Sequence, residues 1–187
     1  MKVCGFTIIR NAVKYDYPVV EAITSILPAC DKFIVLIGNS DDDTLDLIQS
    51  IHSEKIQIHH SVWDDSLREG GRVLALETNK ALDLIPSEYD WAFYIQSDEI
   101  IHEKYIPAIR EAMHRWKDER QVEGLLLKYL HFYGSYDYVG TSRKWYRNEI
   151  RIIKNEKSIR SYKDAQGFRK NGSKLNVVPI NAWVYHY

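Results

Sequence analysis

The sequence predicts an α/β fold in which a mostly parallel sheet is covered by helices on both faces. First, 187 residues with 45% hydrophobic and 27% charged side chains suit one domain with a sizeable core. Second, short apolar runs alternate four times with amphipathic segments in the first hundred residues. Third, each run breaks into polar residues at its end. Strands that alternate with helices of this length are typical of parallel sheets.

Four short runs predict the strands of this first half. They are rich in β-branched and aromatic residues and are bounded by turn residues. The third run alternates and ends in two histidines. Adjacent residues of a strand face opposite ways, so His59 and His60 are not expected to form a metal-binding pair. The expected strands are residues 3–9, 33–37, 56–62 and 91–95.

The segments between these runs predict the covering helices. Pro18 suits a first helical turn, where its missing N–H leaves no bond unmade. Val19, Ile23 and Ile26 follow at helical spacing and would face the sheet. A polar turn precedes the second helix, and a loop over residues 63–71 ending in two glycines precedes the third. The expected helices begin near Asp16, Leu45, Val73 and Tyr105 and end near residues 27, 51, 84 and 116.

The chain after Trp116 changes to an α+β pattern. We expect one domain over residues 1–187, because no linker separates residues 1–115 from residues 116–187. The abrupt end after Tyr187 indicates that the C-terminus is incomplete. Strands are expected at 125–132, 150–153, 177–180 and 182–185, with an interruption at Asn181, and residues 161–174 are expected to be irregular.

Polar clusters follow the expected strands of the first half. Right-handed crossovers would bring the carboxyl ends of these strands to one edge, where open α/β sheets bind ligands. Asp98 and Glu99 follow the buried run 91–95, and two such carboxylates are costly unless a cation or hydrogen bonds compensate. Mg²⁺ typically uses one or two carboxylates plus substrate phosphates. We therefore expect a divalent metal here, with capping of the next helix by Ser97 or Asp98 as the alternative.

The segment Phe93-Tyr-Ile-Gln-Ser-Asp-Glu99 resembles the Asp-x-Asp segment of GT-A fold glycosyltransferases, especially family 2. Asp98 falls on the metal-binding Asp of that motif, and Gln96 stands where its first Asp is expected. Thr7-Ile-Ile-Arg-Asn11 is similar to the family's opening strand. Asn39-Ser-Asp-Asp-Asp-Thr44 resembles its Gly-Ser-x-Asp-x-Thr turn, with Asp42 on the motif Asp, and a solvated acidic cap is the alternative. Ile37-Gly38 replaces the usual acidic residue that reads the base.

The resemblance implies a GT-A fold, a Rossmann-like nucleotide-sugar-binding sheet (residues 1–115) followed by an α+β acceptor half. It implies a nucleotide-sugar site, a Mg²⁺ or Mn²⁺ site, and a base that deprotonates the acceptor. For the base, Asp164 is the first candidate and Glu149 the second. The residues implied for the nucleotide-sugar are Ile9, Arg10, Asn11, Asn39, Asp42, Arg72, Gln96 and Ser97, and those for the metal are Asp98, Glu99 and His186.

The implied function is transfer of a sugar from a nucleotide-diphosphate-sugar to an acceptor hydroxyl with inversion, as in polysaccharide biosynthesis. The acceptor would be a glycan, a lipid-linked molecule or a small molecule. Aromatic residues between Tyr129 and Tyr146 could stack on it, and Lys144, Arg147 and Arg151 either contact its phosphates or form a solvated face. A decayed, non-catalytic sugar- or nucleotide-binding module is the alternative. A sugar-phosphate nucleotidyltransferase is disfavoured because Arg10-Asn-Ala-Val-Lys14 has no glycine.

Composition limits the partners and the compartment. The net charge of −1 argues against broad binding to nucleic acid. No run approaches the ~18 apolar residues that a transmembrane helix needs. Cys4 and Cys30 are expected to be reduced, buried thiols, which fits the cytoplasm, including the cytoplasmic face of a membrane.

Overall fold

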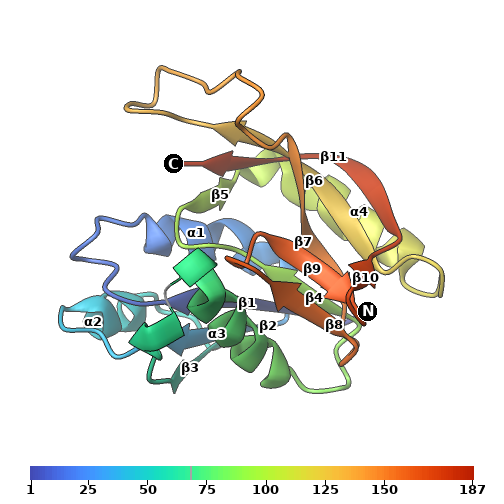
Figure 1. The fold of residues 1–187 in the computed structure, drawn as a ribbon. Coiled ribbons are helices and arrows are strands. Elements are labelled where there is room, and N and C mark those ends of the chain that lie inside the picture. The colour runs from blue at the N-terminus through green and yellow to red at the C-terminus, as the bar shows by residue number, and fades with distance from the viewer. Residues whose placement is uncertain (68) are drawn as a thin grey trace.

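A computed structural model describes residues 1–67 and 69–187 and shows a curled eight-stranded sheet with helices packed on it (Figure 1). The strand order is β3-β2-β1-β4-β7-β6-β11-β5. The sheet strands are β1 (Val3–Ile9), β2 (Lys32–Ile37), β3 (Ile56–His60), β4 (Trp91–Tyr94), β5 (Glu99–Ile101), β6 (Gly124–His131), β7 (Asn148–Lys154) and β11 (Val177–His186).

The first four strands pair in parallel, in the order β3-β2-β1-β4. Their apolar runs face a core on each side. On β2, for example, Phe33 and Val35 pack in one cluster, whereas Ile34 and Leu36 pack in the other. Burial on both faces explains why β1, β2 and β4 read as continuous apolar runs, whereas the edge strand β3 is partly exposed and alternates. The predicted fold class and the four strands of this half are confirmed.

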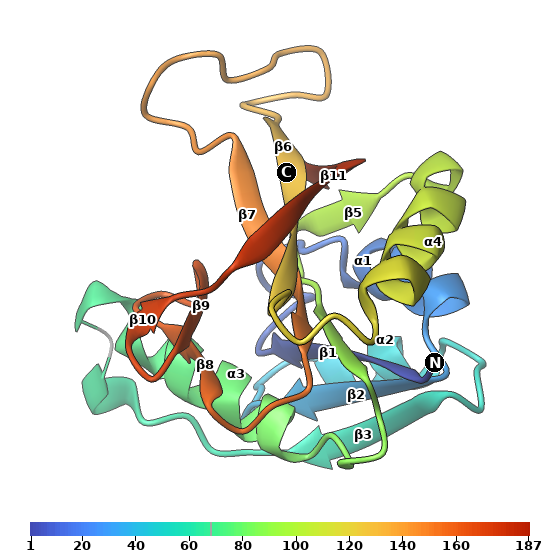
Figure 2. The same cartoon turned by 90° about the vertical axis from the view of Figure 1, so that its right-hand side faces the viewer.

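Two layers of helices cover these strands. Helices α1 (Val19–Ile26), α2 (Thr44–Gln49) and α4 (Ile106–Trp116) contribute Ile23, Ile48 and Ile109 to one cluster. Helix α3 (Arg72–Asp83) contributes Ala81 and Leu82 to the other. Figure 2 shows α3 on one side of β1 and β4, and α1 and α4 on the other side. Four 3-10 turns complete the helical elements of the described chain, at Leu27–Ala29, Asp65–Leu67, Glu69–Gly71 and Glu103–Tyr105.

The second half adds antiparallel strands to the same sheet. Strand β7 pairs antiparallel with both β4 and β6, and β11 runs parallel to β6. The expected interruption near Asn181 is a register shift between Pro179 and Trp183 within the single strand β11. Between β6 and β7, residues 132–147 project away from the body of the molecule (Figure 1).

Two expectations for the connecting segments are wrong. Residues 161–174 are not irregular, because β8 (Ile159–Tyr162), β9 (Gly167–Lys170) and β10 (Ser173–Lys174) form a separate antiparallel sheet. The short strand β5 was not expected either; it begins at Glu99 and pairs with the end of β11. Within the loop expected over residues 63–71, residue 68 lies outside the described residues. In the described part of the chain, no helix has the length and apolar character needed to cross a membrane.

Candidate active site

A cavity of about 490 Å³ lies where the parallel strands β1, β2, β3 and β4 end. The polar segments that follow all four strands contribute to its wall, so the expected convergence at one edge is observed. The described residues that line it are Ile8, Arg10, Asn11, Lys14, Tyr15, Tyr17, Asp41, Trp63, Asp65, Val73, Leu74, Tyr94, Gln96, Ser97 and Asp98.

Arg10 and Asn11 shape this cavity. The Arg10 guanidinium donates to Asp65 at 2.7 Å and to the Asn39 carbonyl at 3.3 Å, and it lies over the Trp63 ring. Asn11 has a left-handed backbone, with φ of 54°, which Asn tolerates better than most residues. Its side-chain oxygen accepts from the N–H of Asp41. These contacts fix the turn after β2 against the end of β1.

Four residues expected at the nucleotide do not line the cavity. Asp42 accepts from the N–H of Lys14 and from both the N–H and the hydroxyl of Thr44. Burial opposes its ionisation, but these hydrogen bonds outweigh burial and lower the pKa of Asp42. The Asn39 side chain accepts from the N–H of Trp63, and Arg72 is exposed at the start of α3. Ile9 is buried in the core. The contacts of Asp42 and Asn39 therefore stabilise the turns around the cavity.

The two carboxylates at the end of the turn after β4, Asp98 and Glu99, lie in different environments. Asp98 lines the cavity. Glu99 is fully buried, and both of its carboxylate oxygens accept hydrogen bonds from Arg151. Asp98 is the last residue of the turn and Glu99 the first residue of β5, so the two neighbours belong to different elements. The sequence suggested Glu99 as a metal ligand, but hydrogen bonds from Arg151 occupy both of its oxygens.

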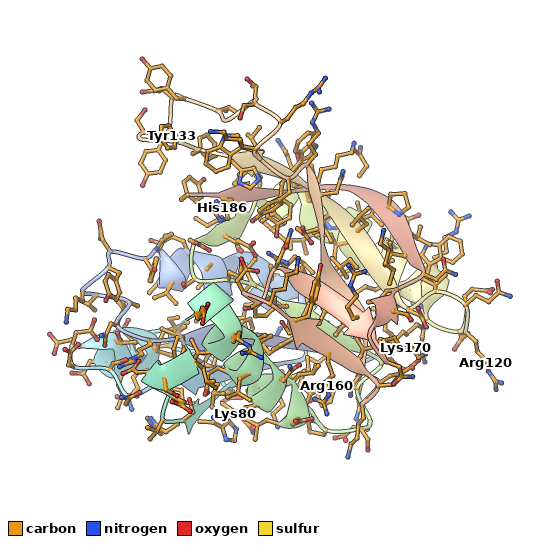
Figure 3. All side chains as sticks on the ribbon, in the orientation of Figure 1. Lys80, Arg120, Tyr133, Arg160, Lys170 and His186 are labelled. Atoms are coloured by element: carbon orange, nitrogen blue, oxygen red, sulfur yellow. The ribbon has the colours of Figure 1, made fainter. Side chains whose placement is uncertain are left out.

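His186, which Figure 3 labels at the end of β11, is the neighbour of Asp98. The carboxylate Oδ2 and the imidazole Nε2 are 3.6 Å apart, which is longer than a hydrogen bond. The N–H of Tyr187 donates to the Asp98 carbonyl and fixes the two segments together. Burial and the Glu99 carboxylate raise the pKa of Asp98, and His186 lowers it. A carboxylate in this state gains from a nearby cation.

Neither of the two candidate bases lines the cavity. Asp164 is exposed at the tip of the hairpin between β8 and β9. A Cβ placed on Gly71 would stand 2.5 Å from the Asp164 Cβ, so the hairpin tip touches the start of α3. Glu149 is partly buried and accepts from the Gln166 side chain at 3.1 Å. Burial raises the pKa of Glu149.

The sequence did not suggest several residues that line the cavity, among them Lys14, Tyr15, Tyr17, Asp41 and Trp63. One signal was available for Trp63. A Cβ at Gly38 would overlap the Trp63 indole, so the glycine after β2 makes room for this ring. A glycine that directly follows a buried strand is a sign of close approach by another group.

Two side chains beside the cavity could bind a divalent metal, those of Asp98 and His186. Across residues 1–67 and 69–187, no group of three or more His, Cys, Asp or Glu side chains is placed to hold an ion. Asp98 and His186 are the pair beside the cavity. Two ligands fit a cation that also binds substrate phosphates and water, as is common for Mg²⁺. Carboxylate ligands suit Mn²⁺ as well. The residues present therefore fit such an ion.

Comparison with known proteins identifies the fold. No family model and no curated protein matches this sequence. Among solved structures, the chain is similar to residues 1–349 of Staphylococcus aureus TarS, a GT-A fold glycosyltransferase. The TM-score is 0.62 at 17% identity, over 100% of this chain and 60% of that one. A structure of the same TarS fragment with UDP gives a TM-score of 0.53 at 19% identity, over 76% and 38%.

A 4-diphosphocytidyl-2C-methyl-D-erythritol synthase from Anaerococcus prevotii is also similar, with a TM-score of 0.52 at 10% identity, over 82% of this chain and 71% of that chain. The chain spans 36% of a longer TarS structure. At these identities the likeness concerns the fold. The predicted GT-A fold, with a mostly parallel sheet flanked by helices, is therefore confirmed.

Proposed function

We propose that this chain is a glycosyltransferase that moves a sugar from a nucleotide-diphosphate-sugar to an acceptor hydroxyl, with a divalent metal and with inversion. The observation that carries the proposal is the position of Asp98. Its side chain lines the cavity at the carboxyl ends of the parallel strands, 3.6 Å from His186. In open α/β sheets, ligands bind outside these strand ends.

Asp98 and His186 are the residues that would hold a Mg²⁺ or Mn²⁺ ion. When bound, such an ion stabilises the negative charge that develops on a departing diphosphate. Glu99 is left out of this ligand set because Arg151 and Tyr129 occupy its carboxylate oxygens. The role of Glu99 is therefore structural in this proposal.

Residues 1–115 would bind the donor. Arg10 and Lys14 place two positive side chains at the cavity wall, each paired with an aspartate that also lines it. A diphosphate can compete for such exposed pairs, because ion pairs in contact with water are weak. Gln96 and Ser97, which precede Asp98 in the chain, also line the wall. The UDP bound by the TarS fragment makes UDP the first nucleotide to test.

Residues 116–187 would bind the acceptor, and Asp164 would accept the proton of its hydroxyl. Asp164 is exposed and lies against Gly71, next to the α3 residues Val73 and Leu74 of the cavity wall. A general base must come within hydrogen-bond reach of the proton that it removes, and an exposed hairpin tip beside the cavity meets that need. The acceptor would be a glycan, a lipid-linked molecule or a small molecule, on the cytoplasmic side.

Thermal unfolding with nucleotide-sugars tests the donor and metal assignments. UDP-, GDP-, dTDP- and CDP-sugars are added with and without Mn²⁺ or Mg²⁺. A ligand that binds only the folded state raises the unfolding free energy, by about 2.7 kcal/mol at 100 times its Kd, and so raises the melting temperature. We expect a metal-dependent rise for at least one donor. Absence of any such rise across the panel would contradict the transferase proposal.

Substitution of Asp98 tests the metal position. Asp98→Asn keeps the shape of the side chain and removes its charge, so the metal-dependent part of the shift should disappear. Asp83→Asn is the matched control, because Asp83 is an exposed aspartate paired with Arg160 at the far end of α3. A shift that persists in Asp98→Asn would show that the metal binds elsewhere.

The rates of sugar transfer by the Asp164→Ala and Glu149→Ala variants distinguish the two candidate bases. Loss of a positioned base typically costs 10²–10⁴-fold in rate, so we expect about that loss of kcat in Asp164→Ala. Its donor-induced rise in melting temperature should remain. If Glu149→Ala loses turnover and Asp164→Ala does not, Glu149 is the base.

A further inference from the structure

The ion pair between Glu99 and Arg151 is fully buried behind the cavity wall. Arg151 Nε lies 2.8 and 3.1 Å from the two carboxylate oxygens, and its Nη2 lies 2.6 Å from Oε1. The Tyr129 hydroxyl donates to Oε1 at 2.6 Å, and the N–H of Gln96 donates to Oε2 at 3.1 Å. Hydrogen bonds therefore saturate the carboxylate, as a buried charge requires.

Besides Glu99 and the adjacent Ile150 carbonyl, at 3.3 Å, Arg151 donates to two other segments of the chain. Nη2 donates to the Gln96 side-chain oxygen at 3.1 Å, on the turn that carries Asp98. Nη1 donates to the Gln166 carbonyl at 2.9 Å, in the hairpin that carries Asp164. The Gln96 amide nitrogen also lies 3.5 Å from the Ala165 carbonyl. The Arg151 guanidinium thus connects the turn at residues 96–98 with the tip of the hairpin between β8 and β9.

The plane of this guanidinium is fixed by two aromatic rings. Its central carbon lies 5.5 Å from the centre of the Tyr94 ring and 5.3 Å from that of Tyr129. Arginine offers five N–H donors in one rigid plane, whereas the lysine ammonium is a compact charge on a flexible stem. A lysine at position 151 could still pair with Glu99, but one ammonium cannot serve Glu99, Gln96 and Gln166 in these directions.

The hairpin tip needs support from its surroundings. Lys163 and Ala165, on either side of Asp164, have φ of 56° and 61°. Residues with a Cβ rarely adopt this left-handed conformation, and it persists where neighbouring structure holds it. The Arg151 bond to Gln166 holds one end of the tip, and the contact with Gly71 holds Asp164 itself.

We propose that Arg151 is a positioning residue that sets the Gln96–Asp98 turn relative to the hairpin tip at residues 163–166. It would keep the spacing between the donor-side carboxylate of Asp98 and the base candidate Asp164, without touching substrate. This inference rests on the proposed function, and it assigns to Arg151 a role different from contact with acceptor phosphates.

Two measurements on Arg151→Lys test the proposal. Arg160→Lys is the matched control, since Arg160 forms an exposed pair with Asp83 and lies on β8, which leads into the same hairpin. The first measurement is hydrogen exchange of the backbone amides of residues 163–167. We expect exchange there to accelerate in Arg151→Lys, while the amides of β1 keep their protection. The control should resemble wild type.

The second measurement is the rate of sugar transfer from the nucleotide-sugar that the thermal unfolding test identifies as the donor. Binding of UDP with Mn²⁺ is measured alongside it. A small displacement of a catalytic group can cost on the order of 10²-fold, so kcat should fall by about tenfold or more while donor KM stays near wild type. A merely structural role would not separate these constants. Faster exchange with unchanged kcat overturns the positioning role, and unchanged exchange overturns the connection itself.

If Arg151→Lys does not fold, Gln96→Met decides, because it leaves the Glu99–Arg151 pair intact. Because Gln96 also lines the cavity, hydrogen exchange alone decides here. Faster exchange at 163–167 supports the connection, and unchanged exchange overturns it, whatever happens to UDP binding. If wild type binds no nucleotide, the proposed function fails, and the exchange experiment still shows whether Arg151 holds the hairpin.

Discussion

The stability of the fold should depend strongly on the buried pair between Glu99 and Arg151. Both side chains have no exposed surface, so removing one partner leaves the other charge buried and unpaired. Such a loss typically costs about 3–5 kcal/mol of unfolding free energy. For a domain of this size, about 2–4 °C of melting temperature corresponds to each kcal/mol, which gives a fall of roughly 6–20 °C. We expect this fall in Glu99→Leu and in Arg151→Met.

The double variant Glu99→Leu with Arg151→Met gives the sharper test. It removes both charges, so its loss should be smaller than the sum of the two single losses, with a coupling of about 0.5–3 kcal/mol. Arg160→Met is the control for the loss of an arginine pair. Exposed pairs contribute about 0–1 kcal/mol, and the side chains of Arg160 and Asp83 are 39% and 53% exposed. Urea unfolding measures all four variants.

The pH dependence follows from the sign of the pKa shift. Burial opposes ionisation of Glu99, but Arg151 outweighs burial and lowers the pKa of Glu99 in the folded state. A lowered carboxyl pKa adds stability above the unfolded value of about 4.3, and this contribution is lost as the pH falls below it. The stability gap between wild type and Glu99→Leu should therefore narrow in acid. Single variants that cost no more than Arg160→Met, or losses that simply add, would refute the reasoning.

Two further predictions concern glycines and thiols. Gly70 and Gly71 both have left-handed φ, of 63° and 67°, but only a Cβ at Gly71 would meet Asp164. Both alanine variants should lose about 1–2 kcal/mol of unfolding free energy, and only Gly71→Ala should also lower the rate of sugar transfer. Equal turnover by the two variants would contradict this prediction. Burial raises the pKa of Cys4 to about 12 and that of the buried Cys30 thiol as well. Neither thiol should react with iodoacetamide until the protein unfolds, and rapid labelling of the folded protein would contradict this.

The first half of the fold was predictable because three of its four strands, β1, β2 and β4, are buried on both faces. Runs such as residues 33–37 are apolar throughout, and the helices between them carry their own periodicity. The hairpin strands β8 and β9 gave no such signal. Their sequences, Ile159-Arg-Ser-Tyr162 and Gly167-Phe-Arg-Lys170, mix polar and apolar residues over only four positions each. Strands this short are stabilised by contacts with the rest of the fold rather than by their own pattern.

The site was predictable in its location and less so in its contacts. Sequence order placed Asp98 at a strand end, and the cavity is there. Nothing in the sequence joins Glu99 to Arg151, which lies 52 positions later. Asp98 ends the turn and lines the cavity, whereas Glu99 begins β5 and is buried. A strand of three residues is too short to be read from sequence, so the two carboxylates looked equivalent.

The same contacts give a physical reading of Gln96, which stands where the resemblance expects an aspartate. Its side-chain oxygen accepts from Arg151, and its nitrogen faces the Ala165 carbonyl. An aspartate could accept from Arg151 but could not donate to Ala165. It would also add a third carboxylate beside Asp98 and Glu99, although Arg151 already balances Glu99. The amide therefore suits a turn that is joined to the hairpin, and a metal here would depend on Asp98 and His186 rather than on two aspartates.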